Sequence, residues 1–382
     1  MMFQLTEEQQ LLKEAAREAA ESILGPTLRE DDERERFRKE YFHALGEAGV
    51  CGVPTAEAYD GLGLGYLEYA IVLEEIARVS ASYAVTVAVN GLPQIILAQY
   101  GNDAQRARYL SGLATGEILG AFALSEPGSG SDAGALKTTA ERDGDHYILN
   151  GTKFWITHGG VADLYVVMVR TGGPGARGIS AFLVEGDTPG LSFGKKEEKM
   201  GLRASPTVEL ILEDARVPAE NLLDQEGEGF RVALSALDSG RITIGAIAVG
   251  IAQASLDVAA PYACAREQFG RPIVDFQGVG FMLADMACRI EASRLLVHKA
   301  AWLRDHHRPY GDVAAMAKCV ATDASLAVAA DAVQVLGGYG YTREYPVERY
   351  MRDAKVMQIV EGTNQVQRLV IARHLKHAYS GV

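Results

Sequence analysis

The stretch LGAFALSEPGSGSDAGALKTTAERDGDHYILNGTKFWITHGG, residues 119–160, marks the point at which the chain changes from helical to β patterning. Further short β-rich runs follow it, such as DLYVVMVR, ISAFLVEG and TVELILED, separated by Gly, Asp, Asn and Pro. The pairs Asp143-Gly144 and Asn150-Gly151 predict hairpin turns. Strands at this spacing, without helices between them, predict a small antiparallel barrel or sandwich rather than a parallel sheet.

Apolar residues recur at helical spacing on both sides of this β segment. Before it, Thr6 and Gln9 form the capping-box pattern that starts a helix. Helices are expected at about residues 67–80, 84–100, 103–113, 230–266, 277–307, 312–336, 346–357 and 365–378. The predicted fold class is therefore α+β, mainly α, with an N-terminal all-α domain at 1–118, a middle β domain at 119–226 and a C-terminal helical bundle at 227–382.

Composition limits the classes of partner. The chain has 382 residues, with 50 acidic and 37 basic side chains and a net charge of -13. Nucleic acids and anionic membrane surfaces attract clustered Lys and Arg, so neither is expected as the main ligand. No apolar run approaches the length of a spanning helix, so no membrane span is expected. The N-terminal residues lack a leader pattern, which indicates a cytoplasmic protein, or a mitochondrial matrix protein whose transit peptide has been removed.

The cysteines and histidines do not indicate a metal site. Cys51, Cys264, Cys288 and Cys319 are far apart and form no CxxC pair, so they are expected to be reduced thiols. No HExxH or comparable cluster is present, and no metal is expected.

Several motifs allow both a functional and an ordinary interpretation. The turn SEPGSGSDAG formally satisfies a GxGxxA fingerprint but lacks a βαβ unit, so it is either a polar cofactor cradle or an ordinary connection. Asp238 and Arg241 are three apart on a helix and could simply pair. Glu361 is a lone carboxylate before a helix start, a place where carboxylates are common and mostly structural.

Together, and in this order, the motifs ALSEPGSGSD, WITHGG, LDSGR, REQFGRPIVDFQ, QVLGGYGYTREYPVER and VEGTNQ resemble those of the acyl-CoA dehydrogenases. The resemblance covers almost the whole chain, from LTEEQQ to LVIARHL, and is nearest to the short-chain, butyryl-type branch. It implies an FAD-dependent enzyme with an N-terminal helical domain, a middle antiparallel β-barrel, a C-terminal four-helix bundle and a homotetrameric assembly.

The resemblance also implies roles for residues that match the family's motifs. Glu361 matches the catalytic base. A relative carries its base on the helix of Asp238 and Arg241, one residue before the arginine, where this chain has Gly240. Contacts to the CoA thioester are implied for Ser131, Asp238, Arg241 and Gly362. Contacts to FAD are implied for Phe122, Leu124, Ser125, Gly130, Ser131, Trp155, Ile156, Thr157, Thr363 and Gln365, and, across a subunit interface, for Arg266, Gln268, Phe269, Phe276, Gln277, Gln334, Val335, Leu336, Gly337 and Gly338.

Two positions depart from the family pattern. Ser125 stands where threonine is usual, which keeps the hydroxyl group. His158 stands where asparagine is frequent, which leaves its role open.

The implied reaction is fatty acid β-oxidation chemistry, in which a saturated acyl-CoA becomes a trans-2-enoyl-CoA. Glu361 would take the α-proton, the β hydrogen would leave as hydride to FAD N5, and electrons would pass to an electron-transfer flavoprotein. The backbone N–H of Glu361 and a flavin ribityl hydroxyl would stabilise the thioester oxygen. The segment SASYAVTVAVNGLPQIILAQYG favours short or medium straight chains.

Two other functions remain open from the sequence. An oxygen-using acyl-CoA oxidase or flavin monooxygenase relative would be longer or would lack the base. A non-catalytic acyl- or flavin-binding scaffold would have lost Glu361 or the turn from Ser125 to Ser131, and neither is lost.

Overall fold

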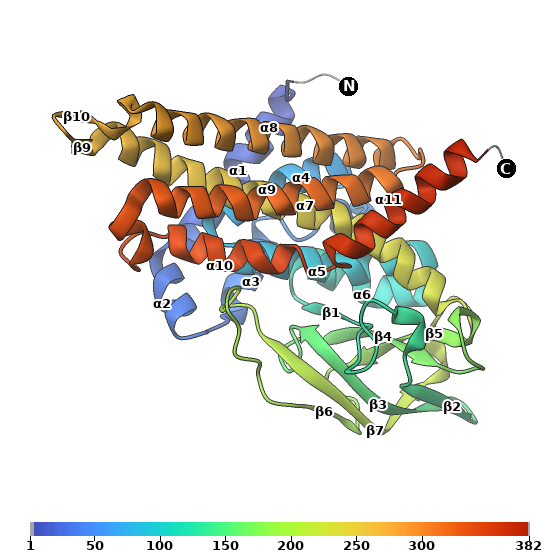
Figure 1. Cartoon of the computed structure of the whole chain (residues 1–382). Coiled ribbons are helices and arrows are strands. Elements are labelled where there is room, and N and C mark those ends of the chain that lie inside the picture. Colours follow the sequence, from blue (N-terminus) through green and yellow to red (C-terminus); the bar gives the residue numbers. More distant parts are fainter. Residues whose placement is uncertain (1–3, 381–382) are drawn as a thin grey trace.

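The computed structural model describes residues 4–380. Figure 1 shows the long C-terminal helices lying across the N-terminal helices, with the β sheet against one side of this helical body. The chain thus passes from helices to strands and back to helices. The last N-terminal helix ends at Thr115, the first strand begins at Gly120, and the next long helix begins at Gly229. We therefore propose that the N-terminal helical domain ends near residue 118 and the middle β domain near residue 226.

The N-terminal helices form where apolar residues recur along the chain. Their bounds are α1 Glu7–Leu24, α2 Leu28–Glu33, α3 Lys39–Glu47, α4 Tyr66–Val79, α5 Ala81–Tyr100 and α6 Asp103–Thr115. The predicted capping box at the start of α1 is confirmed. Thr6 N donates to Gln9 Oε1 at 3.0 Å, and Gln9 N donates to Thr6 Oγ1 at 3.2 Å.

The middle segment forms one mixed sheet within residues 4–380. Its strands are β1 Gly120–Ala123, β2 Thr139–Asp143, β3 His146–Thr157, β4 Leu164–Arg170, β5 Ile179–Glu185, β6 Leu191–Phe193, β7 Thr207–Pro218 and β8 Leu222–Leu223. The order is β6-β7-β3-β2-β4-β5-β8, with β1 beside β4. Most pairs are antiparallel, as predicted, but β1 and β2 each pair with β4 in parallel. The sheet is therefore mixed rather than wholly antiparallel.

The two predicted hairpin turns have different outcomes. The turn at Asp143-Gly144 is confirmed: Asp143 ends β2 and pairs with His146, and Gly144 and Asp145 form the turn between β2 and β3. The prediction for Asn150 and Gly151 is wrong, because β3 continues through them with a register shift against β7. Gly151 has φ 141°, and an added Cβ would lie 2.7 Å from Thr138 Oγ1. This glycine therefore permits a bulge and a close backbone approach rather than a turn.

The C-terminal helices match the predicted segments to within a few residues. They are α7 Gly229–Ala265, α8 Gln277–Asp305, α9 Gly311–Leu336, α10 Val347–Met357 and α11 Asn364–Tyr379. Between α7 and α8, β9 Glu267–Gln268 and β10 Arg271–Pro272 form a small hairpin. Phe269 and Gly270 have φ 52° and 78° at its tip. The Phe-Gly pair is thus a hairpin turn that follows the end of the helix.

The expectation that the chain holds no apolar segment of spanning length is wrong. In the described part, three helical segments are long and apolar enough by length and composition, namely Ala81–Tyr100, Gly229–Ala265 and Gly311–Tyr341. Of their most apolar windows, 89%, 78% and 56% are buried inside the protein, in that order. Burial within the fold accounts for the composition of α5 and α7, since helices covered on several sides are apolar all round.

Candidate active site

Glu361 lies in the turn between α10 and α11. Its backbone has φ 54°, and the following Gly362 has φ 85°, so both residues are left-handed. This conformation is uncommon for glutamate and persists where the surrounding structure enforces it. Thr363 then caps α11, because its Oγ1 accepts from the backbone N–H of Val366 at 3.3 Å. The direction of the Glu361 side chain is therefore set by a left-handed turn that the capped start of α11 holds in place.

The Glu361 carboxyl is packed against α7 at Gly240. A Cβ added to Gly240 would lie 2.6 Å from Glu361 Oε2. This oxygen is buried and has no hydrogen-bond partner among residues 4–380, although the residue as a whole keeps some exposure. Burial raises the pKa of Glu361 to about 7, while the charges of Arg241 and Lys318 act to lower it. The site therefore holds a carboxyl group that can take up and release a proton near neutral pH.

Asp238 and Arg241 stand beside this carboxyl on α7. The predicted pairing is present, since Arg241 Nη1 donates to Asp238 Oδ1. Arg241 is buried, and its Nε finds no acceptor within the described chain. Burial raises the pKa of Asp238, while Arg241 acts to lower it. Asp238 also lines a cavity of about 470 Å³ together with Tyr310, Phe230 and Arg231. The Asp238–Arg241 pair therefore lies between the Glu361 carboxyl and this surface cavity.

A second layer of contacts, which the sequence interpretation missed, supports this pair. The Ser239 hydroxyl lies 3.2 Å from the Tyr310 hydroxyl and accepts from Arg304 Nε at 3.0 Å. The Arg304 guanidinium stacks over the Tyr66 ring, 3.4 Å from its centroid. These contacts fix Tyr310 at the wall of the cavity.

Lys318 was also missed by the sequence interpretation, although one signal pointed to it. It is the single charged residue in the apolar run AAMAKCVA of α9. Its side chain is fully buried, and Nζ donates to Gly362 O at 3.0 Å and to Asn364 Oδ1 at 2.9 Å. A lysine in such a run needs a polar partner inside the fold, and here that partner is the turn that bears Glu361.

The Gly- and Ser-rich turn after β1 is anchored by a buried ion pair. Glu126 accepts from the backbone N–H groups of Lys137 and Thr138 at 2.6 and 2.9 Å, and from Lys153 Nζ at 2.7 Å. Lys153 also donates to Leu124 O at 3.3 Å and is fully buried. Burial lowers the pKa of Lys153 to about 8, while Glu126 acts to raise it. Lys153, which the motif analysis passed over, therefore ties the turn to β3.

The turn and β3 present an open face for a flat ligand. Phe154 N donates to Ser125 O at 2.8 Å, which places Ser125 beside the neighbouring Trp155. Trp155 has φ 63° at a bulge in β3, and its side chain is 59% exposed although tryptophan in a strand is usually buried. A Cβ on Gly128 or Gly130 would meet nothing within 4 Å. An exposed ring beside hydroxyls and open backbone fits the isoalloxazine and polar chain of FAD.

His158 has a structural environment in this chain. It is fully buried, and its Nδ1 lies 3.0 Å from Gly120 O. Its Nε2 has no partner in the part of the chain that the structure describes. Burial lowers the pKa of His158 to about 4, although the contact with Gly120 acts to raise it. The ring is therefore neutral at physiological pH and joins the end of β3 to β1.

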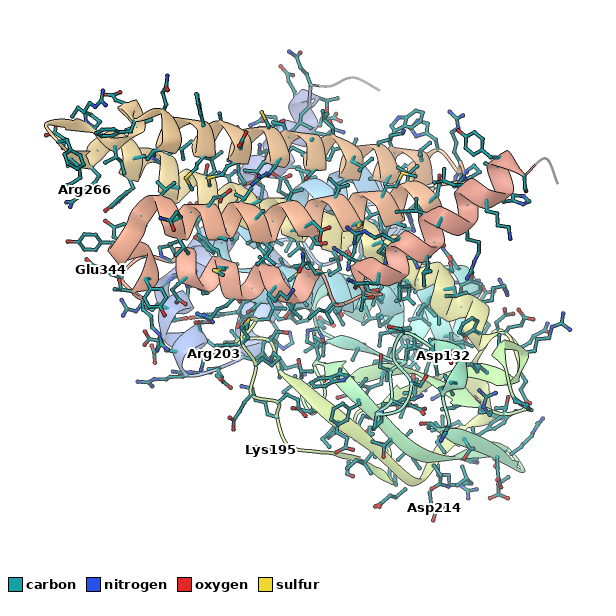
Figure 2. All side chains as sticks on the ribbon, viewed as in Figure 1. Asp132, Lys195, Arg203, Asp214, Arg266 and Glu344 are labelled. Carbon is teal, nitrogen blue, oxygen red and sulfur yellow. The ribbon has the colours of Figure 1, made fainter. Side chains whose placement is uncertain are left out.

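The residues expected at a subunit interface form a separate group at the far end of the helices. In Figure 2, Arg266 lies there, whereas Asp132 lies on the sheet side of the molecule. Tyr262 near the end of α7 contacts Tyr339, with ring centroids 6.5 Å apart, so the hairpin and the end of α9 are neighbours. Phe269 is 94% exposed, whereas Val335 and Leu336 are buried in their own chain.

The structure thus places the predicted residues in distinct groups. One surrounds Glu361 and contains Gly362, Thr363 and Gln365 around the start of α11, with Asp238 and Arg241 on either side of Gly240 on α7. Another lies along β1, its turn and β3, and contains Phe122, Leu124, Ser125, Gly130, Ser131, Trp155, Ile156 and Thr157. The third lies at the far end of α7, α8 and α9, and contains Arg266, Gln268, Phe269, Phe276, Gln277, Gln334, Val335, Leu336, Gly337 and Gly338. Since Gly240, beside Glu361, lies about 38 Å along α7 from Ala265 at its end, the third group is not part of the Glu361 site of its own chain.

Comparisons with known proteins agree with this arrangement. Sequence profiles of the acyl-CoA dehydrogenase N-terminal, middle and C-terminal domains match residues 6–117, 121–215 and 227–376. The short-chain specific acyl-CoA dehydrogenase of Clostridium acetobutylicum is 46% identical over 374 residues, covering 97% of this chain and 99% of that protein.

Solved structures give the same result at the level of the fold. Butyryl-CoA dehydrogenase from Megasphaera elsdenii has a TM-score of 0.96 and 44% identity, covering 98% of this chain and 100% of that chain. A chain in a structure described as the electron transferring flavoprotein of Acidaminococcus fermentans has a TM-score of 0.97 and 49% identity, covering 98% of this chain and 99% of that chain.

Proposed function

Because the chain belongs to the acyl-CoA dehydrogenase family of FAD-dependent oxidoreductases, we propose that Glu361 is the base with which it converts a saturated acyl-CoA into a trans-2-enoyl-CoA. The observation that carries this assignment is the Glu361 carboxyl itself. Its Oε2 is buried over Gly240 without a hydrogen-bond partner in the described chain, and its pKa is about 7. A structural carboxylate at a helix start would instead bond to backbone N–H groups, as the Thr363 side chain does here.

The residues of the turn and β3 would hold the cofactor. Ser125, Ser131 and Thr157 supply hydroxyl groups, and Trp155 supplies a flat apolar surface. Gly130 leaves the backbone open to a close approach. When bound, FAD accepts the hydride that leaves the β carbon of the substrate. The task of these side chains is to orient the ring system, because the chemistry depends on alignment.

The substrate would enter between α7 and the sheet. Asp238 lies at the cavity of about 470 Å³, and Arg241 stands behind it beside Glu361. The thioester would lie with its α carbon at Glu361 Oε2, which receives the proton. The backbone N–H of Glu361 would donate to the thioester oxygen as its charge develops. Burial of the site strengthens each of these interactions, since water is excluded.

The first experiment tests the reaction and the base together. The purified protein is expected to be yellow, and a short saturated acyl-CoA added without oxygen should bleach the flavin. Glu361→Gln should still bind FAD and acyl-CoA, yet reduce the flavin at least about 100-fold more slowly, since a positioned base contributes about that much. A protein that cannot be loaded with FAD, or a Glu361→Gln variant with normal activity, contradicts the proposal.

The second experiment concerns chain length, for which we propose short straight acyl chains. The support is the 46% identity to a relative named as short-chain specific and the structural likeness to a butyryl-CoA dehydrogenase. Flavin reduction should be faster with four-carbon than with sixteen-carbon acyl-CoA in stopped-flow measurements, and a preference for the longer chain would overturn this assignment.

We also propose a homotetramer, an electron-transfer flavoprotein as electron acceptor and a cytoplasmic location. The separation of the third residue group from the Glu361 site supports an assembly in which subunits share FAD. The likeness to a chain in a structure described as an electron transferring flavoprotein supports the acceptor. Relatives come from bacteria and from mitochondria, so a matrix location would follow if a transit peptide has been removed.

A further inference from the structure

Lys318 is a buried charged side chain to which the reaction outlined above assigns no part. It lies on α9 among apolar neighbours, and its side chain is fully buried. Nζ donates to the carbonyl oxygen of Gly362 at 3.0 Å and to Asn364 Oδ1 at 2.9 Å. Both acceptors belong to the segment that follows Glu361. The lysine is therefore directed at the turn that bears the base.

That turn needs support from outside itself, because Glu361 and Gly362 are both left-handed. Gln367 provides part of it, since its Nε2 donates to Glu361 O at 3.1 Å and to Gly362 O at 2.8 Å. Lys318 adds a further hydrogen bond to the turn from another helix, α9. The Gly362 carbonyl thus accepts from two side chains, one on α11 and one on α9, and its orientation is fixed against both helices.

Asn364 extends the connection from Lys318 to the start of α11. Its Nδ2 donates to Thr322 Oγ1 at 2.9 Å and to Asp323 Oδ1 at 2.7 Å, while its Oδ1 accepts from Lys318. Asp323 in turn accepts from Arg368 at 2.8 Å. The stretch of α9 from Lys318 to Asp323 therefore holds the first residue of α11 and the turn before it.

The charges near Glu361 come from several elements. Arg241 approaches from α7 and is paired with Asp238 on the same helix. Lys318 approaches from α9, where Cys319 and Asp323 are its neighbours, and Arg368 on α11 is bonded to Asp323. Arg241 has its own acidic partner in Asp238. Burial lowers the pKa of Lys318 to about 8, while Glu361 is the acidic group that acts most strongly to raise it, ahead of Asp323, which is engaged by Asn364 and Arg368.

We propose that Lys318 is a positioning residue for Glu361, holding the Glu361–Gly362 turn through the Gly362 carbonyl and adding, beside Arg241, a positive charge that favours the ionised form of the base. This inference rests on the proposed role of Glu361 as the base. Lys318 lies on α9, whereas Glu361 lies in the turn before α11. The packing of α9 against α11 would therefore set the position of the base.

The test compares Lys318→Met, Lys318→Gln and Lys318→Arg with the wild-type holoenzyme, using a short acyl-CoA and a dye as electron acceptor. Lys318→Met removes both the donor and the charge, so kcat should fall about 100-fold while KM changes little, since a small displacement of a catalytic group has that effect. The acidic limb of the pH profile of kcat should move to higher pH, because the pKa of Glu361 rises when a nearby positive charge is removed. Lys318→Arg, which keeps the charge, should return the limb toward its wild-type position.

Lys153→Met is the matched control, since Lys153 is likewise a fully buried lysine but is paired with Glu126, away from the Glu361 turn. It should weaken FAD retention without moving the acidic limb. Unchanged kcat and an unmoved limb in folded, FAD-loaded Lys318→Met overturn the proposal, as does an equal shift in Lys153→Met. If Lys318→Met does not fold, Lys318→Gln serves as the test, because glutamine keeps a hydrogen-bond donor but carries no charge. An unmoved acidic limb in Lys318→Gln then refutes the proposed effect of the Lys318 charge on Glu361.

Failure of this proposal can be told apart from failure of the proposed function. A wild-type enzyme that acyl-CoA does not reduce, or an active Glu361→Gln variant, contradicts the function. Normal wild-type catalysis with unaffected Lys318 variants contradicts the positioning role alone.

Discussion

At the scale of single residues, Glu361 shows how competing effects set the chemistry of a carboxyl group. Burial favours its neutral form and raises its pKa, whereas Arg241 and Lys318 favour the charged form. The balance leaves the pKa at about 7 instead of the ordinary 4.5. A base must be ionised to act, so activity is expected to rise with pH through this value.

The same shift predicts how Glu361 affects stability. The folded protein holds this proton more tightly than the unfolded chain, so stability is lost as pH rises from about 4.5 to about 7. Glu361→Gln cannot ionise and should be more stable than the wild type above pH 7, by up to about 3 kcal/mol, and no more stable below pH 4.5. Thermal unfolding of the FAD-loaded proteins at several pH values measures this.

The surface variant Glu344→Gln is the control for that measurement, since Glu344 is exposed. It should follow the wild-type pH dependence. A Glu361→Gln variant that gains no stability at high pH would show that the carboxyl is already ionised or solvated in the folded protein.

At the scale of elements, β3 combines several irregular features in a single strand. It passes through two register shifts against β7, exposes Trp155 and buries Lys153. Lys153 reaches across to Glu126 in the turn after β1, so strand and turn form one unit. The Gly- and Ser-rich turn is held by this ion pair, which explains how a segment rich in small residues can present a defined surface.

Removing the charge of Glu126 should therefore loosen the turn. Glu126→Gln keeps one acceptor oxygen for the backbone N–H of either Lys137 or Thr138, turns the other oxygen into an amide donor, and leaves Lys153 as an uncompensated buried charge. A loss of about 3 kcal/mol in unfolding free energy is expected, together with weaker retention of FAD on gel filtration. Glu141→Gln on the neighbouring β2 is the control, since Glu141 is exposed and should tolerate the change. Equal FAD retention in both variants would contradict the role of the ion pair.

At the scale of the whole molecule, charged residues connect all three parts of the chain. Arg352 on α10 donates to Asp32 Oδ2 at 2.8 Å and to Met200 O at 3.0 Å, and Leu202 N donates to Asp353 Oδ1 at 2.6 Å. Burial raises the pKa of Asp353 to about 6, while the Leu202 contact acts to lower it. These bonds fix the loop before β7 against both helical parts.

The far end of the helices remains uncovered in a single chain, which leads to a prediction about assembly. Phe269 is 94% exposed at the tip of the β9–β10 hairpin, where its φ of 52° suits aspartate better than phenylalanine. Phe269→Asp should therefore leave the subunit folded but weaken the proposed tetramer and FAD binding. Light scattering after size-exclusion chromatography and the flavin content measure both effects.

Leu11→Asp is the matched control for that experiment, because Leu11 is 66% exposed on α1, away from the hairpin. It should change neither the assembly nor the flavin content. A Phe269→Asp protein with wild-type mass and flavin content would show that the hairpin is not an interface.

Much of this arrangement could be predicted from the sequence. Helical spacing located the long helices, and the Thr6 capping box marked the start of α1. The ordered motifs also proposed Glu361 as the candidate base. The errors occurred where a local pattern is overruled by packing. Asn150-Gly151 has the pattern of a turn, yet β7 and Thr138 hold it within β3 as a bulge. The apolar windows of α5 and α7 reach spanning length because these helices are covered inside the protein.

By itself, the sequence determined the order of helical, β and helical segments, the family and the identity of the candidate base, because these depend on residue types and their spacing along the chain. The tertiary structure alone decided that Gly240 makes room for Glu361, that Lys318 and Arg241 converge on it from two helices, and that Lys153 anchors the turn. Those contacts join residues far apart in the chain, and the burial that shifts the pKa of Glu361 exists only once the helices have packed.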